Sequence, residues 1–176
     1  MEIVPGLITV SSIVGNIRGD PRLAEVYHRM AGKNMAESIT ISRSESQRSR
    51  MRKRSDKGTD IAFTLDQGVH IRHRDVVMLT ENKIVVIDIE PEDVAMIEVK
   101  ENAKDEILNL GIRIGHIIGN LHRPIKIEEN RIFFPIQADT EIDMLRNLLH
   151  PIADHVEIKK TSMIFEPEEE MKVHAH

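Results

Sequence analysis

The sequence predicts an α+β fold with two structured regions followed by a short tail. The first region consists of short apolar strand patterns separated by frequent turns, and the second shows strands and helices in the order β-α-β-β-α-β. That order is the split arrangement of ferredoxin-like folds. An acidic segment with a proline, at residues 90–93, separates the two. We therefore expect an N-terminal antiparallel β domain at residues 1–90, a ferredoxin-like domain at residues 91–166 and a flexible polar tail at residues 167–176.

Composition narrows the class of protein. The 176 residues include no cysteine, which excludes disulfides and thiolate metal ligands. No apolar run approaches the roughly 20 residues of a membrane helix, and the first residues lack the layout of a secretory signal, so we expect a cytoplasmic protein without membrane contact. A net charge of −5 and an aromatic content of 3% disfavour nucleic-acid binding. The nine histidines are the main chemical resource that remains.

Apolar patterns and turn residues predict the elements of the first region. Asp20 and Pro21 are typical of a helix start, as N-cap and first helical residue, and Gly32 closes that helix. His70 and His73 lie beside arginines whose positive charge opposes cation binding, so we expect both at the surface. The strands of this region are expected at residues 7–17, within residues 38–65, and at residues 76–79 and 84–89.

A basic stretch interrupts the first region, beginning at Arg43 and ending at Lys57. Four arginines within it recur at every second position, so in a strand all four point the same way; they are Arg48, Arg50, Arg52 and Arg54. One interpretation is a solvated edge hairpin whose charges prevent aggregation. The other is a docking surface for an acidic partner protein or nucleic acid.

The second region contains the clearest helix of the chain. Its apolar residues recur at three- and four-residue spacing and predict one buried face made by Ile107, Leu110, Ile114 and Ile117. Asn102 is the expected N-cap of this helix. A later helix, ending before Pro151, begins where Thr140 and Asp143 resemble a capping box. The order of elements is a strand at residues 94–99, a helix at 103–118, strands at 124–127 and 131–136, the later helix, and a strand at 156–165.

His122 lies on a short turn after the first of these helices. Gly119 and Asn120 are residue types that tolerate the left-handed conformation at a helix end, and Pro124 prevents the helix from continuing. A turn held by a rigid scaffold is a common place for binding residues. His122 is therefore the candidate functional residue, and the competing interpretation is a structural histidine that stabilises the last carbonyl groups of the helix.

Three glycines of this helix point to an interface beside His122. Gly111, Gly115 and Gly119 share one face, and an interior glycine costs about 1 kcal/mol relative to alanine. Close approach by another backbone, from this chain's sheet or from a second subunit, would explain them. A two-fold axis near His122 would pair it with its copy.

Such a pair of imidazoles suits Ni, Cu or Zn when it is completed by His174 and His176 of the tail or by water. The competing interpretation is that these two tail histidines are a surface feature without a ligand role. The other histidines are expected to be structural or solvent-facing, with the ligand role of His116 left open; they are His28, His116, His150 and His155.

The residues around the turn resemble a known family. The run from Gly119 through Asn120, Leu121 and His122 to Pro124 resembles the Gly-Asn-Arg-His signature of UreE, the nickel metallochaperone family of urease maturation, with Leu121 where arginine is common. The stretch at residues 165–168, before a histidine-bearing tail, is also similar. The resemblance implies a homodimer joined through the C-terminal domains, with residues 1–90 as a partner- or peptide-binding domain.

The resemblance also implies a metal site and its purpose. His122 of each subunit would bind one Ni²⁺, with His174 and His176 completing the coordination, and Zn²⁺ or Cu²⁺ substituting in vitro. The metal would pass to the urease apoprotein through accessory proteins that include a GTPase. No catalysis by this chain is implied.

Two other functions are weighed against this one. An RNA-binding module would use the ferredoxin-like sheet and the basic hairpin from Arg43 to Lys57. Phe133 and Phe134 are adjacent strand residues, so only one could reach a base. A metal-dependent enzyme is disfavoured, because no histidine is spaced with a general base and no nucleophile elbow or phosphate loop is present.

Overall fold

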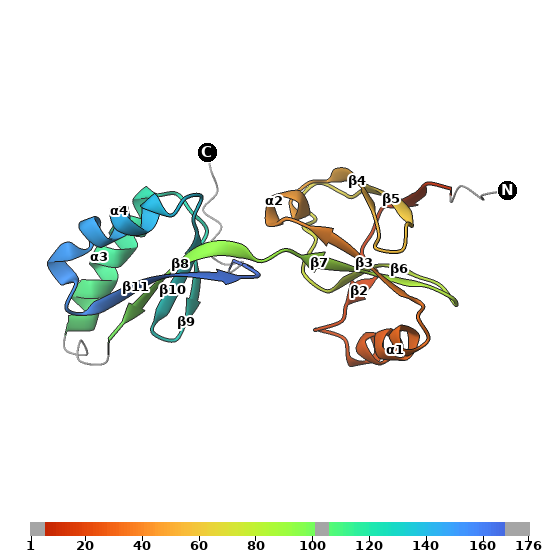
Figure 1. Cartoon of the computed structure of the whole chain (residues 1–176), viewed down its shortest axis with the longest axis horizontal. Coiled ribbons are helices and arrows are strands. Elements are labelled where there is room, and N and C mark those ends of the chain that lie inside the picture. The colour runs from red at the N-terminus through yellow and green to blue at the C-terminus, as the bar shows by residue number, and fades with distance from the viewer. Residues whose placement is uncertain (1–5, 101–105, 168–176) are drawn as a thin grey trace. The chain divides into compact units, whose positions relative to one another are not determined.

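The computed structural model describes residues 6–100 and 106–167 (Figure 1). The chain divides into two compact units between Glu90 and Pro91, and each unit contains both helices and β-strands. The predicted α+β class is therefore confirmed. In the described part of the chain, no helix is both long and apolar enough to cross a membrane.

The first unit contains two sheets of mixed strand direction. Their strand orders are β1-β5-β4 and β2-β6-β7-β3, and the pairs β1–β5 and β3–β7 are parallel. Three of the five strand pairs of this unit are antiparallel, in line with a mostly antiparallel region. The two parallel pairs were not expected, because alternation identifies a strand without specifying its partner. The elements are β1 (Ile8–Val10), β2 (Gly15–Asn16), α1 (Pro21–Gly32), β3 (Ala36–Ile41), α2 (Arg43–Ser46), β4 (Arg50–Arg54), β5 (Asp60–Thr64), β6 (Asp75–Leu79) and β7 (Ile84–Ile89).

The first two strands differ from their prediction, whereas the first helix agrees with it. The single strand expected at residues 7–17 is two short strands, β1 and β2, which belong to different sheets. The helix that follows is confirmed at both ends. The Asp20 carboxylate accepts hydrogen bonds from the backbone N–H groups of Arg22 at 2.9 Å and Leu23 at 3.3 Å, and α1 ends at Gly32.

The basic stretch is only partly a strand. Ser42 caps the short helix α2 with Glu45 in a capping box, so the beginning of the stretch is helical. Arg48 lies before β4, which leaves Arg50, Arg52 and Arg54 as the row of exposed arginines on one face of that strand. β4 is the last strand of its sheet order, so the edge position expected for this stretch is confirmed.

The second unit is built on one antiparallel sheet with strand order β11-β8-β10-β9. Its helix α3 ends two residues later than expected, and the proposed N-cap Asn102 lies outside the described residues. The elements are β8 (Glu92–Val99), α3 (Ile107–Asn120), β9 (Lys126–Glu128), β10 (Arg131–Pro135), α4 (Thr140–Leu148), a 3₁₀ turn (His150–Ile152) and β11 (Val156–Met163).

The helices α3 and α4 lie on the same side of this sheet (Figure 1). Successive strand residues point to opposite faces, and β10 shows this directly. Phe134 belongs to the core beneath the helices, whereas Phe133 packs on the other face with Val94 and Phe165. The helix-side core also contains Leu110, Ile114, Ile118, Ile142 and Leu145. Ile107 was expected on the buried face of this helix, but it lies in the first turn of α3 and is 59% exposed.

Candidate metal-binding turn

The turn after α3 places His122 in a left-handed backbone conformation. Gly119 and Asn120 were expected to adopt it, but α3 continues through both, and His122 has φ +50°. The Leu121 N–H donates to the Ile118 carbonyl at 2.9 Å and the His122 N–H donates to the Gly119 carbonyl at 3.1 Å. These two bonds satisfy carbonyl groups that the helix end would otherwise leave unpaired.

A positive φ at a residue other than glycine is uncommon, although histidine adopts it more readily than most residues. Such conformations persist where the surroundings hold them, and they cluster at functional sites. The His122 side chain is exposed, so its imidazole is open to a ligand. Residues 6–100 and 106–167 contain no group of three His, Asp or Glu side chains placed to hold a metal ion, so His122 alone does not complete a site.

The residue after His122 is fixed to another part of the second unit. Arg123 Nη1 donates to the Pro135 carbonyl at 2.6 Å and lies 2.7 Å from Glu141 Oε2. The other carboxylate oxygen of Glu141 accepts from the backbone N–H groups of Gln137 at 2.7 Å and Ala138 at 3.2 Å. We call this arrangement of Arg123, Pro135 and Glu141 the Arg123 anchor.

Electrostatics stabilise the carboxylate of the Arg123 anchor. Partial burial acts to raise the pKa of Glu141, but the backbone hydrogen bond from Gln137 and the charge of Arg123 outweigh it and hold that pKa below its usual range.

The capping box expected from Thr140 and Asp143 is absent, since the N-cap of α4 is Asp139 without a side-chain bond. Asp143 instead pairs with Arg146 at 3.0 Å. The sequence alone did not identify the Arg123 anchor.

The outward face of α3 is apolar and open. Leu108 is 77% exposed and Ile112 is 64% exposed. Gly111, Gly115 and Gly119 share this face, and apart from the adjacent backbone of α3 no heavy atom of the described residues would lie within 4 Å of a Cβ added at any of the three. The chain's own sheet therefore does not approach these glycines, which removes one of the two expected explanations.

The remaining histidines contribute little to a site within the described residues. His174 and His176 lie outside those residues. His116 is exposed, with Nε2 3.4 Å from Asn120 Nδ2. His73 was expected at the surface but is half-buried, and its Nδ1 accepts from the Ile89 N–H at 3.1 Å. His155 is also half-buried, with Nε2 3.6 Å from Glu106.

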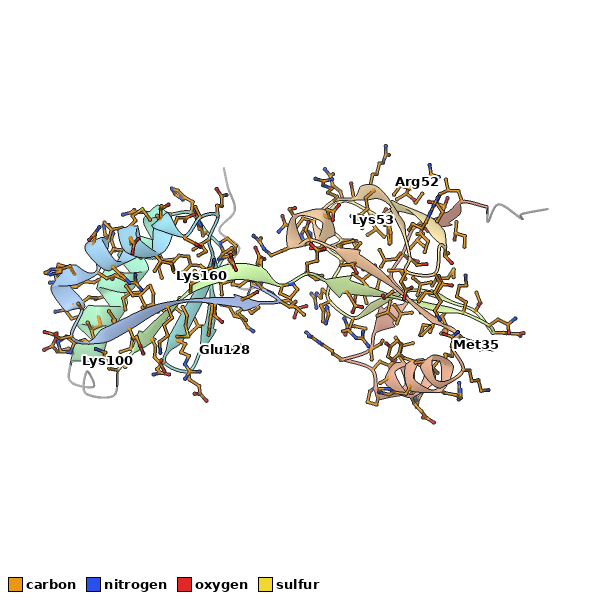
Figure 2. All side chains as sticks on the ribbon, in the orientation of Figure 1. Met35, Arg52, Lys53, Lys100, Glu128 and Lys160 are labelled. Carbon is orange, nitrogen blue, oxygen red and sulfur yellow. The ribbon has the colours of Figure 1, made fainter. Side chains whose placement is uncertain are left out.

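The features suggested for RNA binding are occupied by structural contacts. Phe133 and Phe134 are 6% and 0% exposed, so neither ring is available to stack on a base. On β4, Arg52 donates to both carboxylate oxygens of Asp60, at 2.9 and 2.8 Å, and Arg54 donates to one of them at 3.3 Å. Arg52 is labelled on this strand in Figure 2.

Comparison with known proteins finds relatives of one name and a family model that matches the first unit. Residues 10–90 match the family model described as the UreE urease accessory protein, N-terminal domain. A curated urease accessory protein UreE from Natronomonas pharaonis is 29% identical over 133 residues, covering 76% of this chain and 61% of the relative. Relatives of the same name from Yersinia bercovieri and Yersinia pestis are 30% identical over 139 residues, covering 76% of this chain and 60% and 58% of the relatives.

These relatives are all named as urease accessory proteins. The matched part spans about 60% of their length. The particular family that these matches support is UreE, the family that the residues around His122 resemble.

Proposed function

We propose that this protein is a nickel-binding metallochaperone that delivers Ni²⁺ to the urease apoprotein during assembly of the active site. The relation to UreE supports this role, since the relatives are named for urease. The observation that carries the proposal is the exposed His122, held at φ +50° on an anchored turn beside an open apolar helix face.

The second unit would act as a ferredoxin-like metal-binding and dimerisation domain. Its strand order and its two helices on one face support that assignment. Two copies would meet through the outward face of α3, where the exposed Leu108 and Ile112 supply apolar area and the open glycines permit close contact. The symmetry would bring His122 of one subunit near His122 of the other.

The proposed coordination uses imidazole nitrogens only. His122 from each subunit would bind the ion, and His174 and His176 would complete the shell. Nickel, copper and zinc all accept imidazole ligands, so Zn²⁺ or Cu²⁺ would substitute in vitro. A protonated imidazole cannot ligate, so binding should weaken in acid.

The proposed partners follow from the same family relation. The protein would act in the cytoplasm on the urease apoprotein, together with urease accessory proteins that include the GTPase. The first unit, at residues 1–90, would contact partner proteins or peptides. The arginine row of β4 is the part of that unit most suited to an acidic partner. Arg50 is exposed, and Arg52 and Arg54, although paired with Asp60, remain 64% and 69% exposed in their side chains.

Titration calorimetry with Ni²⁺, combined with the mass in solution, tests the proposal. The wild type should bind about one Ni²⁺ per dimer, and His122→Ala should lose that tight site. His150→Ala removes another exposed histidine of the same unit and serves as the matched control. Deleting residues 172–176 should weaken binding while leaving the dimer intact. Equal affinities of the wild type and His122→Ala would refute the proposed site.

A further inference from the structure

The turn that carries His122 is connected to the sheet and to α4 by one guanidinium group. Arg123 follows His122 directly, and its Nη1 reaches both the Pro135 carbonyl at 2.6 Å and Glu141 Oε2 at 2.7 Å. Pro135 is the last residue of β10, and Glu141 lies in the first turn of α4. The backbone beside His122 is therefore fixed to two elements that the chain reaches only later.

The contacts of the Arg123 anchor are partly shielded from water. The side chains of Arg123 and Glu141 are 22% and 16% exposed. Hydrogen bonds between charged groups are shorter and stronger than neutral ones, and partial burial reduces their screening by solvent. The three donors to the Glu141 carboxylate leave it little freedom to move, because both of its oxygens are engaged.

Other arginine pairs of the same unit differ from the anchor. Arg146 pairs with Asp143 at 3.0 Å, but their side chains are 58% and 73% exposed. Arg131 pairs with Glu98 at 3.0 Å with 49% and 22% exposure. Exposed ion pairs of this kind contribute little to stability. Among the ion pairs of the second unit's described residues, the anchor thus combines low exposure with direct attachment to the His122 turn.

We infer that Arg123 is a positioning residue for the binding of Ni²⁺ by His122. The guanidinium keeps the His122 backbone at φ +50° before the metal arrives, so the ion does not have to order the turn. Groups that orient a metal ligand typically change metal affinity by about 10- to 100-fold when they are removed. This inference rests on the proposed function, because it assumes that His122 is a ligand.

The test measures Ni²⁺ affinity by titration calorimetry of the full chain. Arg123→Ala should weaken binding about 10-fold, and Arg123→Lys should give an intermediate affinity because an ammonium group can still donate to Glu141. Arg146→Ala removes an exposed arginine of the same unit and should bind as the wild type does. Unchanged affinity in Arg123→Ala would overturn the inference, and so would equal losses in Arg123→Ala and Arg146→Ala.

A second variant and a structural readout separate positioning from stability. Glu141→Gln can still accept from Gln137 and Ala138 but loses the charge that faces Arg123. It should also weaken Ni²⁺ binding. The double variant Arg123→Ala/Glu141→Gln should lose less binding free energy than the sum of the two single losses, because both variants remove the same contact. The HN–Hα coupling of His122 without metal should change in both single variants. A lower Tm with unchanged affinity and coupling would mean a structural role only, and would overturn the inference.

The two proposals fail in distinguishable ways. Full Ni²⁺ affinity in His122→Ala would refute the proposed function itself. Loss of binding in His122→Ala, together with wild-type binding in Arg123→Ala and Glu141→Gln, would leave the proposed function standing and refute the role of Arg123. If Arg123→Ala does not fold, Glu141→Gln and Arg123→Lys decide the matter.

Discussion

Replacing Gly115 by alanine should have opposite effects on folding and on association. Gly115 lies inside α3, and the added Cβ would meet no heavy atom within 4 Å among the described residues beyond the adjacent backbone of the helix. Interior glycine costs a helix about 1 kcal/mol relative to alanine. The free energy of unfolding of the isolated subunit should therefore rise by about 1 kcal/mol, and the variant Gly111→Ala/Gly115→Ala should gain about twice that amount.

Association should change in the other direction if two copies meet through this face. The added methyl groups would then lie where the helices approach, and the dissociation constant of the dimer should increase. Urea unfolding at several protein concentrations separates the two effects, because the apparent stability of a dimer depends on concentration. Sedimentation equilibrium measures the association directly.

Gly32→Ala is the matched control, since Gly32 ends a helix of the first unit and is also open. It should leave the dimer unchanged. A less stable monomer in Gly115→Ala would contradict the open space around Gly115. An unchanged dissociation constant would contradict close contact between the α3 helices.

Two further predictions concern stability. Hydrogen bonds from Arg52 lower the pKa of Asp60 from 3.8 to about 2, so the contribution of Asp60 to stability is present above about pH 4 and is lost as the pH falls through about 2. In Asp60→Asn, this part of the pH dependence should vanish from urea titrations between pH 2 and 5. An unchanged pH profile in that variant would contradict the prediction. Phe134→Ala removes a ring that is 0% exposed and should lower the free energy of unfolding by about 3–5 kcal/mol. Ile127→Ala, 39% exposed on the neighbouring strand, should cost far less in the same urea titration, and equal losses would refute the assignment of Phe134 to the core.

Local signals in the sequence were sufficient for several elements. The N-cap Asp20 with Pro21 located the start of α1, because capping depends on neighbouring residues alone. The apolar spacing of Leu110 and Ile114 located α3, because a helix repeats its buried face every three or four residues. His122 was selected by its place between that helix and Pro124.

Features that depend on distant segments were not predictable in this way. The parallel pairing of β3 with β7 is not encoded within either strand. The left-handed residue was assigned to Gly119 or Asn120 from residue preference, but α3 continues past both and the turn adopts that conformation at His122. The Arg123 anchor joins a turn to a helix start much later in the chain, and a single arginine beside a proline gives no local sign of that partner.

The position of Phe165 has a consequence for how this protein can vary. Its ring is 1% exposed and closes the sheet face opposite the helices, against Val94 and Phe133. As far as the described residues extend, this is the last side chain of the chain that the core needs. Truncation before Phe165 would therefore uncover both of its partners, whereas a chain cut after Pro167 would keep every core side chain that the structure describes.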